Sequence, residues 1–198
     1  MAAPRSQPQQ TRAHAMRRRL LDTGLQLLRG GPDALTTSAV ADAAHVSIGT
    51  VYRYFNDRED LLGELLDAAI RDVYNDLASA VGTALGLELD PAMRHIAEAL
   101  TSTFERHADV LRAFADRGFD SDLSRGVEQT LFALARVIPA RHRPDLTPAQ
   151  LDDLVFVSMG FVATGCLRIA LQRPAGSDRD AMIDVTARML AAALAPAA

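Results

Sequence analysis

Residues 35–62 read LTTSAVADAAHVSIGTVYRYFNDREDLL, and this stretch decides the fold. It predicts two short helices, over 38–44 and 48–55, joined by a three-residue connection from His45 to Ser47. Thr37 is placed to cap the first helix and Ser47 the second. Two helices of this length on so short a connection are typical of a helix-turn-helix.

The two predicted helices have an apolar and a polar face. Small side chains at Ala41 and Ala44 allow the helices to approach closely. The residues spaced to share a small core are Val40, Ala41, Ala44, Val46, Val51, Tyr52 and Phe55. The residues expected on the exposed face of the second helix are Gly49, Thr50, Arg53 and Tyr54. Such a face can lie in the major groove of DNA.

Helical periodicity continues on both sides of this stretch, and sustained strand-like alternation is absent from the sequence. A first helix is predicted over 11–29, ended by the Gly-Gly-Pro of residues 30–32. Asp57 is a natural cap for a long fourth helix over 58–85. Further helices are predicted over 91–106, 108–118, 121–138, 148–173 and 177–194, with prolines between them.

The predicted fold is therefore all-α, with about nine helices by hydrophobic periodicity. It divides into a flexible arm over 1–11, a three-helix, helix-turn-helix DNA-binding domain over 12–56, and a larger helical domain over 57–198. The first of these is polar and rich in Pro and Gln, which is typical of flexible segments.

Charge is divided unevenly along the chain. Residues 1–58 hold eight Arg and four Asp, a net charge of +4, whereas residues 59–198 hold 13 Arg and 21 acidic residues, a net charge of −8. A basic head on an acidic body concentrates positive potential where an anion docks. The single cysteine, Cys166, fits a reducing compartment, so we expect a cytoplasmic protein. Polar residues interrupt the apolar stretch 154–171, and no membrane span is expected there.

The stretch resembles the DNA-binding domain of the TetR family of regulators. The matching residues are Thr37 three positions before Val40-Ala41, Val46-Ser47, Gly49-Thr50-Val51-Tyr52, Tyr54-Phe55, and Arg58-Glu59 followed by Leu61-Leu62. The resemblance is close over residues 12–65 and architectural elsewhere. His45 stands where the family often has Gly, and His tolerates a positive φ better than most side chains. Arg58 stands where the family usually has Lys, and it keeps the charge.

This resemblance implies that the protein binds double-stranded operator DNA. Thr37 and Ser47, which lie at helix starts, are expected to hold phosphates, as is Arg58 at the start of the fourth helix. Tyr52 and Tyr54 resemble tyrosines whose hydroxyls reach the DNA backbone. Tyr52 also remains a candidate for the core, and the two roles can coexist.

A second group of residues is expected to contact the base edges of DNA or to reach the DNA from the first helix. The candidates for base edges are Ile48, Gly49, Thr50 and Arg53. Arg53 suits a bidentate contact to guanine. Arg17 and Arg18, from the first helix, are expected to touch phosphates or the minor groove. The alternative for these two arginines is a solvated helix face.

The remainder of the sequence carries no catalytic motif. It contains no phosphate loop, nucleophile elbow, paired-His zinc motif or Cys cluster, so we expect neither an enzyme, a metal site nor a cofactor. The resemblance implies instead a cavity between body helices for a small-molecule effector. The expected wall residues are Phe104, Leu111, Phe114, Phe132, Phe156 and Met159. A solid core is the alternative for each of them.

The two C-terminal helices, over 148–173 and 177–194, carry small residues on one face. In the resembled family such helices pair with their copies, which implies a homodimer. The expected function is a repressor released from a palindromic operator by a small, largely apolar effector. One alternative is an activator or a co-repressor-dependent regulator on the same scaffold. The other is a helical small-molecule-binding protein or enzyme with a vestigial helix-turn-helix.

Overall fold

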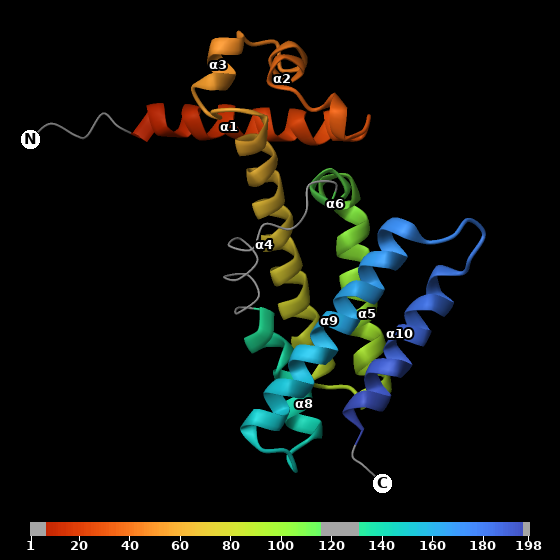
Figure 1. The fold of residues 1–198 in the computed structure, drawn as a ribbon. Coiled ribbons are helices and arrows are strands. Elements are labelled where there is room, and N and C mark those ends of the chain that lie inside the picture. The colour runs from red at the N-terminus through yellow and green to blue at the C-terminus, as the bar shows by residue number, and fades with distance from the viewer. Residues whose placement is uncertain (1–6, 116–130, 196–198) are drawn as a thin grey trace, which may run out of the picture. The chain divides into compact units, whose positions relative to one another are not determined.

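The computed structural model describes residues 7–115 and 131–195 of the 198-residue chain. All regular elements in these ranges are helical, and nine of them are α-helices, in agreement with the predicted all-α fold (Figure 1). The predicted helix over 121–138 lies partly outside the described residues.

Two compact units make up the chain. One, here called the head, comprises Met1–Ala69 with Asp109–Gly118, and the other, here called the body, comprises Ile70–Ala108 with Phe119–Ala198. The division falls inside the long helix α4 (Arg58–Ala84), whose first turns belong to the head and whose remainder belongs to the body.

The N-terminal part of the head is built from four helices and a short 3₁₀ turn. It contains α1 (Gln7–Leu28), η1 (Pro32–Ala34), α2 (Thr37–Ala43), α3 (Ile48–Tyr52) and the start of α4 (Figure 1). The first helix begins at Gln7, four residues before the start that periodicity predicted. The side chains at the centre of the head are fully or almost fully buried: Leu20, Leu28, Leu35, Val40, Val51, Phe55 and Leu61.

A close approach between α1 and α4 depends on Gly24. A Cβ atom at this position would lie 2.9 Å from Cδ2 of Leu61 and 3.3 Å from Cδ1 of Leu35. The first distance is shorter than carbon atoms tolerate, so a side chain here would force the Leu61 side chain to move. The hydrogen of Gly24 therefore sets how tightly the first turns of α4 pack into the head.

Hydroxyl caps start the helices around the turn. Ser47 accepts from the backbone N–H of Thr50 at 3.2 Å, as predicted. The cap of α2 is Thr36 and not Thr37, because Thr36 Oγ1 accepts from the N–H of Ala39 at 3.1 Å. The helix therefore begins one residue earlier than expected, and the Thr37 side chain does not cap it.

The turn between α2 and α3 has the unusual backbone that the sequence suggested. His45 adopts a φ of 51°, the one positive value at a non-glycine residue in the described ranges. Its N–H donates to the carbonyl of Asp42 at 3.1 Å, and the N–H of Val46 donates to the carbonyl of Ala41 at 3.0 Å. These two bonds end α2 and reverse the chain, so the left-handed residue sets the angle at which α3 leaves.

The body has three long helices that pack side by side around an apolar core (Figure 1). They are α5 (Leu89–Arg106), α9 (Pro148–Gln172) and α10 (Arg179–Leu194), and the body part of α4 and the short α8 (Val137–His142) complete it. Pro139 was expected to end a helix, but it lies in the first turn of α8, where its missing N–H is not needed. The helix α6 (Ala108–Ala115) belongs to the head apart from its first residue.

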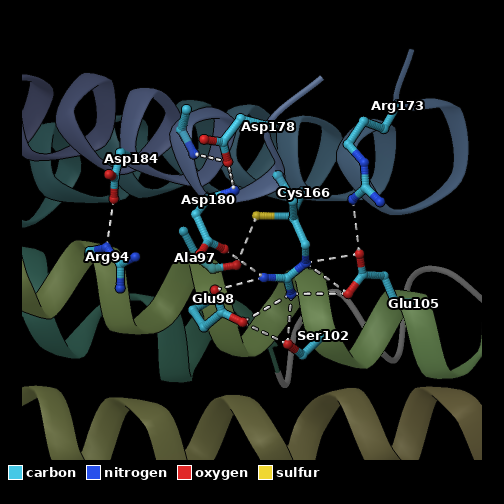
Figure 2. A network of polar contacts seen from close by, with 12 residues as sticks. Arg94, Ala97, Glu98, Ser102, Glu105, Cys166, Arg173, Asp178, Asp180 and Asp184 are labelled. Carbon is cyan, nitrogen blue, oxygen red and sulfur yellow. Dashed lines mark hydrogen bonds and ion pairs between the residues drawn. The ribbon is translucent and has the colours of Figure 1, made fainter. Parts of the chain in front are cut away.

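A polar cluster joins α10 to α5 at the edge of this core (Figure 2). Arg179 donates to Glu98 at 2.9 Å, to Glu105 at 3.0 Å and to Ser102 at 3.0 Å. Arg173, at the end of α9, donates to the same Glu105 at 3.3 Å. The hydrogen bond from Arg179 holds the pKa of Glu98 below its usual range. One guanidinium thus fixes the start of α10 against two turns of α5.

Candidate functional site

A polar face on α3 is the most exposed functional surface of the head. Ser47, Ile48, Gly49 and Arg53 are exposed, and Tyr52 retains 54% of its accessible surface. Thr50 and Tyr54 are half-buried at the margin. The residues that sequence analysis grouped as base and backbone contacts are therefore brought together on and around one short helix.

Hydroxyl groups are paired along this face. The hydroxyls of Thr37 and Tyr52 lie 3.5 Å apart, which joins α2 to α3. Those of Ser47 and Thr50 lie 2.9 Å apart. In each pair one hydroxyl donates to the other, so one proton remains available to an outside acceptor. A phosphate oxygen is such an acceptor, and hydroxyls are common phosphate contacts in DNA complexes.

Tyr52 does not belong to the core, contrary to one of the two expectations. Val51 and Phe55, which are four residues apart, occupy the inward positions and are almost fully buried. Tyr52 follows Val51 by one residue, so the helix turns its side chain about 100° away from them. Its ring is therefore available to a partner.

Gly49 has no packing reason to be glycine. A Cβ atom built there would meet a single neighbour, Ser47 Oγ, at 3.9 Å. Its φ is not in the left-handed region, because it lies within α3. The missing side chain therefore leaves room above the helix rather than inside the head, which suits close approach of another surface.

Arg58 has a different place from the one that the sequence suggested. Its Nε donates to the carbonyl of Leu35 at 2.6 Å, its Nη2 donates to the carbonyl of Pro32 at 2.7 Å, and its Nη1 reaches Glu59 at 3.3 Å. Only 20% of the side chain is exposed. The guanidinium therefore holds the segment that leads into α2, and the expected phosphate contact stays a prediction.

The arginines of α1 divide into two kinds. Arg17 pairs with Glu64 and lies over the Phe55 ring, 5.2 Å from its centroid, so it clamps α1 to α4. Arg19 donates to the carbonyl of Ala44 at 2.5 Å, at the end of α2. Arg18 is exposed. Of the two arginines that sequence analysis assigned to DNA, Arg18 is thus the more accessible.

The body holds an apolar cavity of about 100 Å³. Its walls come from α4, α5, α8, α9, α10 and the helical residues 131–135, and they include Leu77, Ile96, Leu100, Val155, Val162 and Leu190. Ser158 on α9 is the single polar side chain among its described lining residues. A cavity of this character favours a hydrocarbon group over a charged one.

Two of the six expected wall residues, Phe104 and Met159, line this cavity. Phe156 is 62% exposed, because Val155 and Met159 occupy the inward positions of α9 and Phe156 points away from them. Phe132 is half-buried, but its neighbour Leu131 lines the cavity in its place. The last two expected residues, Leu111 and Phe114, lie on α6 in the head and not in the body wall.

Sequence analysis missed the contribution of α4 to the cavity. Val73, Leu77 and Val81 line it at intervals of four residues. This spacing is a helical stripe that periodicity can detect. The expectation favoured aromatic and methionine side chains, whereas most of the wall is aliphatic.

Large apolar side chains are also exposed on the last two helices of the body. Phe156, Val157 and Phe161 on α9, with Val185 and Met189 on α10, are between 39% and 68% exposed. By length and composition α9 is apolar enough to cross a membrane, and 28% of its most apolar window is buried. The core helices of soluble proteins meet the same criteria of length and composition, although they are mostly buried. No group of three potential metal ligands occurs within 7–115 and 131–195.

Known proteins with similar sequences are DNA-binding regulators, and the similarity includes the residues of the polar face. Residues 20–65 match the family model of bacterial regulatory proteins of the TetR family. The chain is 29% identical over 130 residues to the uncharacterized HTH-type transcriptional regulator YvkB of Bacillus subtilis, an alignment that covers 51% of this chain and 68% of that protein. The segment that matches the family model contains α2, α3 and the first turns of α4, where the polar face lies.

Solved structures extend the agreement to the body. FadR of Thermus thermophilus, a TetR-family transcriptional repressor solved with lauroyl-CoA, is 26% identical, with a TM-score of 0.61 over 88% of this chain and 92% of that one. FadR of Bacillus halodurans shares the fold at 14% identity, with a TM-score of 0.59 over 88% and 94%. From the helix-turn-helix residues outward to the fold of both units, the chain is similar to members of the TetR family, and these matches support a DNA-binding transcriptional regulator.

Proposed function

We propose that this regulator is a cytoplasmic, homodimeric repressor that leaves a palindromic operator when a small apolar effector binds its body. The observation that carries the proposal is the cavity of about 100 Å³ in the body, whose wall includes residues of α4. That helix begins at Arg58 in the head, so one continuous element belongs to both the effector cavity and the DNA-binding unit.

Contacts to DNA are assigned to the polar face of α3 and its neighbours. The hydroxyls of Thr37, Ser47 and Tyr52 bind phosphates, as does the Arg18 guanidinium, while Arg53 and Thr50 reach base edges. Exposure of these groups and the open space above Gly49 support the assignment. Ile48, 41% exposed, adds an apolar contact, and Tyr54 at the margin contributes its hydroxyl.

The test of this surface is binding to the protein's own promoter region by fluorescence anisotropy across a salt series. The Arg53→Ala variant should bind about 5- to 150-fold more weakly, as loss of one base contact predicts. Arg71→Ala, at an exposed arginine in the body part of α4, is the matched control and should bind as wild type. Equal affinities of the two variants would exclude Arg53 from the interface.

Dimerisation is assigned to the exposed apolar surface of α9 and α10. Five large apolar side chains are left uncovered there, more than isolated surface residues account for. A second copy of the same two helices covers them in an isologous interface. Two heads held in this way present their α3 helices to half-sites roughly 34–36 Å apart, one turn of DNA.

Sedimentation velocity tests the dimer. Val157 is 68% exposed, so Val157→Asp places a charge in the interface without disturbing the monomer fold. We expect wild type to sediment as a dimer and this variant as a monomer with weakened operator binding. Val137→Asp, at an apolar residue of α8 that is 37% exposed, is the control and should remain dimeric. A wild-type monomer that co-sediments with lipid vesicles would assign the surface to a membrane instead.

Release by effector requires unequal affinity for two states. A ligand weakens operator binding only if it binds the DNA-incompetent conformation more tightly. The solved FadR relative holds lauroyl-CoA, and the apolar wall in this chain suits a hydrocarbon group of its own effector. Apolar cavities of about 150 Å³ accept benzene, so a cavity of this order favours a small molecule.

Transcription from the bound promoter separates repression from its alternatives. Loss of the gene should raise transcription if the protein is a repressor and lower it if it is an activator. An effector that tightens operator binding identifies a co-repressor-dependent regulator. A protein with a vestigial head shows no salt-dependent binding to its promoter.

A further inference from the structure

The effector cavity combines an apolar wall with one hydroxyl. Ser158 lies near the middle of α9 and is 8% exposed. The cavity wall on both sides of it is apolar, with Val155 and Met159 on the same helix and Leu190 on α10. The position of the hydroxyl in this wall therefore decides what kind of polar group, if any, a ligand can carry into the cavity.

The Ser158 hydroxyl makes no hydrogen bond with the described part of the chain. Of the other buried hydroxyls on body helices, Thr103 donates to the carbonyl of Ala99 at 2.9 Å, and Thr186 donates to that of Met182 at 3.0 Å. The Thr101 hydroxyl also has no partner in the described part of the chain, but it does not line the cavity. A buried hydroxyl without a partner is unfavourable. Ser158 is thus a donor and acceptor that stands ready for a group inside the cavity.

Charged groups are absent from the described lining of the cavity. The charged cluster of the body, Arg179 with Glu98 and Glu105, is bonded within itself and does not line it. A carboxylate or ammonium group in the cavity would lose its hydration without gaining an opposite charge. One hydroxyl satisfies one neutral oxygen, so the lining favours neutral oxygen over ionised groups.

We propose that the effector is an uncharged, mainly hydrocarbon molecule with a single hydrogen-bonding oxygen, a hydroxyl or carbonyl, that binds Ser158. The inference rests on the proposed function, because it specifies the ligand of the same cavity. Ser158 is a specificity residue in this arrangement, since it selects among apolar molecules by their oxygen.

Three probes of similar size test the proposal: toluene, phenol and benzoate. Toluene and phenol differ by a methyl in place of a hydroxyl, and phenol is neutral at pH 7 because phenolic pKa values lie near 10. Binding is followed by NMR of ¹³C-labelled methionine methyls. Met93 and Met159 line the cavity, whereas Met189 is exposed on α10 and serves as the outside reference.

Wild type and Ser158→Ala are compared with each probe. Because one neutral hydrogen bond is lost, phenol should bind the variant about 2- to 10-fold more weakly, while toluene binds it equally or more tightly. Benzoate should leave the Met93 and Met159 signals in place. Phenol affinity that does not change in Ser158→Ala, or benzoate binding as tight as that of phenol, overturns the proposal.

Cavity-filling variants distinguish failure of this inference from failure of the proposed function. Ala163→Leu fills the cavity and should abolish binding of toluene and phenol alike, and Ala135→Leu replaces it if the first variant melts early. One outcome is that the filled variant no longer binds toluene while phenol affinity is the same with and without Ser158. That outcome would disprove the contact between Ser158 and the ligand oxygen, but it would leave the cavity as an effector site. Absence of binding by both neutral probes in wild type removes the cavity as an effector site and this inference with it.

Discussion

Head and body use their polar groups in opposite ways. The head turns hydroxyls and a guanidinium outward around α3, with Tyr52 54% exposed. The body turns aliphatic side chains inward around a cavity and leaves one hydroxyl, Ser158, among them. The first arrangement suits a charged, hydrated polymer and the second a small molecule without charge. The two units therefore suit partners of different chemistry, and helix α4 runs through both units.

The same difference appears in the arginines. In the head, Arg17 and Arg58 are held by Glu64 and by backbone carbonyls, whereas Arg53 is exposed on α3. In the body, Arg179 is held by two glutamates of α5, Glu98 and Glu105. A positive charge in the sequence is thus no measure of DNA contact. The bonds that each guanidinium already makes decide which arginine remains for a partner.

Truncation of the head core gives the largest expected effect and tests whether the units are separable. Phe55 is 1% exposed, so Phe55→Ala should destabilise the head by about 3–5 kcal/mol and abolish operator binding. The body cavity should still bind toluene, as reported by the Met93 and Met159 methyls. Simultaneous loss of both activities would contradict the separation of head and body.

Substitution of Arg58 tests whether an arginine stabilises the head or contacts DNA. Arg58→Met loses two charge-assisted hydrogen bonds to carbonyls, so the head should lose about 2–3 kcal/mol of unfolding free energy. The salt dependence of operator binding should stay unchanged at temperatures where the variant is folded. Arg53→Ala should show the reverse, with normal stability and weakened binding. If the slope of the logarithm of the operator-binding constant against the logarithm of salt concentration were smaller in magnitude by about 0.9 in Arg58→Met, Arg58 would contact a phosphate after all.

The head was more predictable from sequence than the body because its determinants are local. The Ser47 cap and the positive φ of His45 depend on residues within one turn, and both agree with the structure. The error at Thr37, by one residue, is also local. The structural role of Arg58 was missed for another reason: its partners, Pro32 and Leu35, are more than 20 residues away, and no local pattern indicates that they accept its hydrogen bonds.

The cavity required information that local pattern does not contain. A helix with apolar residues on several faces does not reveal which face is inward until its neighbours are placed. Phe156 was expected in the wall and is exposed, whereas Met159, three residues later, is in it. The packing of α5, α9 and α10 makes this choice. Size and flexibility of a side chain were therefore poor guides to the lining, and the angular position on each helix was the decisive quantity.

Loss of the Arg179 cluster should destabilise the body at neutral pH and spare the head. The Arg179 side chain is 25% exposed, so Arg179→Met should lower the unfolding free energy by about 1–2 kcal/mol. Loss of one partner from a fully buried ion pair would cost more. Operator binding by the folded variant should be retained. Arg71→Met, at an exposed arginine of the body, is the control and should leave stability unchanged.

Acid titration checks the same cluster. The pKa of Glu98 is lowered in the folded state, chiefly by its hydrogen bond with Arg179. Its contribution to stability is therefore present above the pKa of the unfolded chain and is lost as the pH falls through the lower folded value. Wild type should lose stability over this acidic range, and Arg179→Met should lose less. Parallel curves for the two proteins would show that the pair contributes nothing.

Left-handed backbone positions give the smallest effect and compare the units directly. His45 in the head has a φ of 51°. Gly176, between α9 and α10, has a φ of 79°, and a Cβ atom added there would meet no other atom within 4 Å. Gly176→Ala should therefore cost about 1 kcal/mol through backbone strain alone. His45→Gly relieves strain but increases the entropy of the unfolded chain, so the gain should be at most about 0.5 kcal/mol.

Thermal unfolding of Gly176→Ala and His45→Gly measures the difference between their effects on stability. A third variant, His45→Val, extends the comparison. A β-branched side chain tolerates a positive φ poorly, so His45→Val should destabilise the head by about 1–2 kcal/mol where His does not. The His45 side chain is exposed, so valine has no buried contact to replace. If valine and glycine gave equal stability at residue 45, backbone conformation would not be what sets the angle between α2 and α3. The Gly176 result would then describe the body alone.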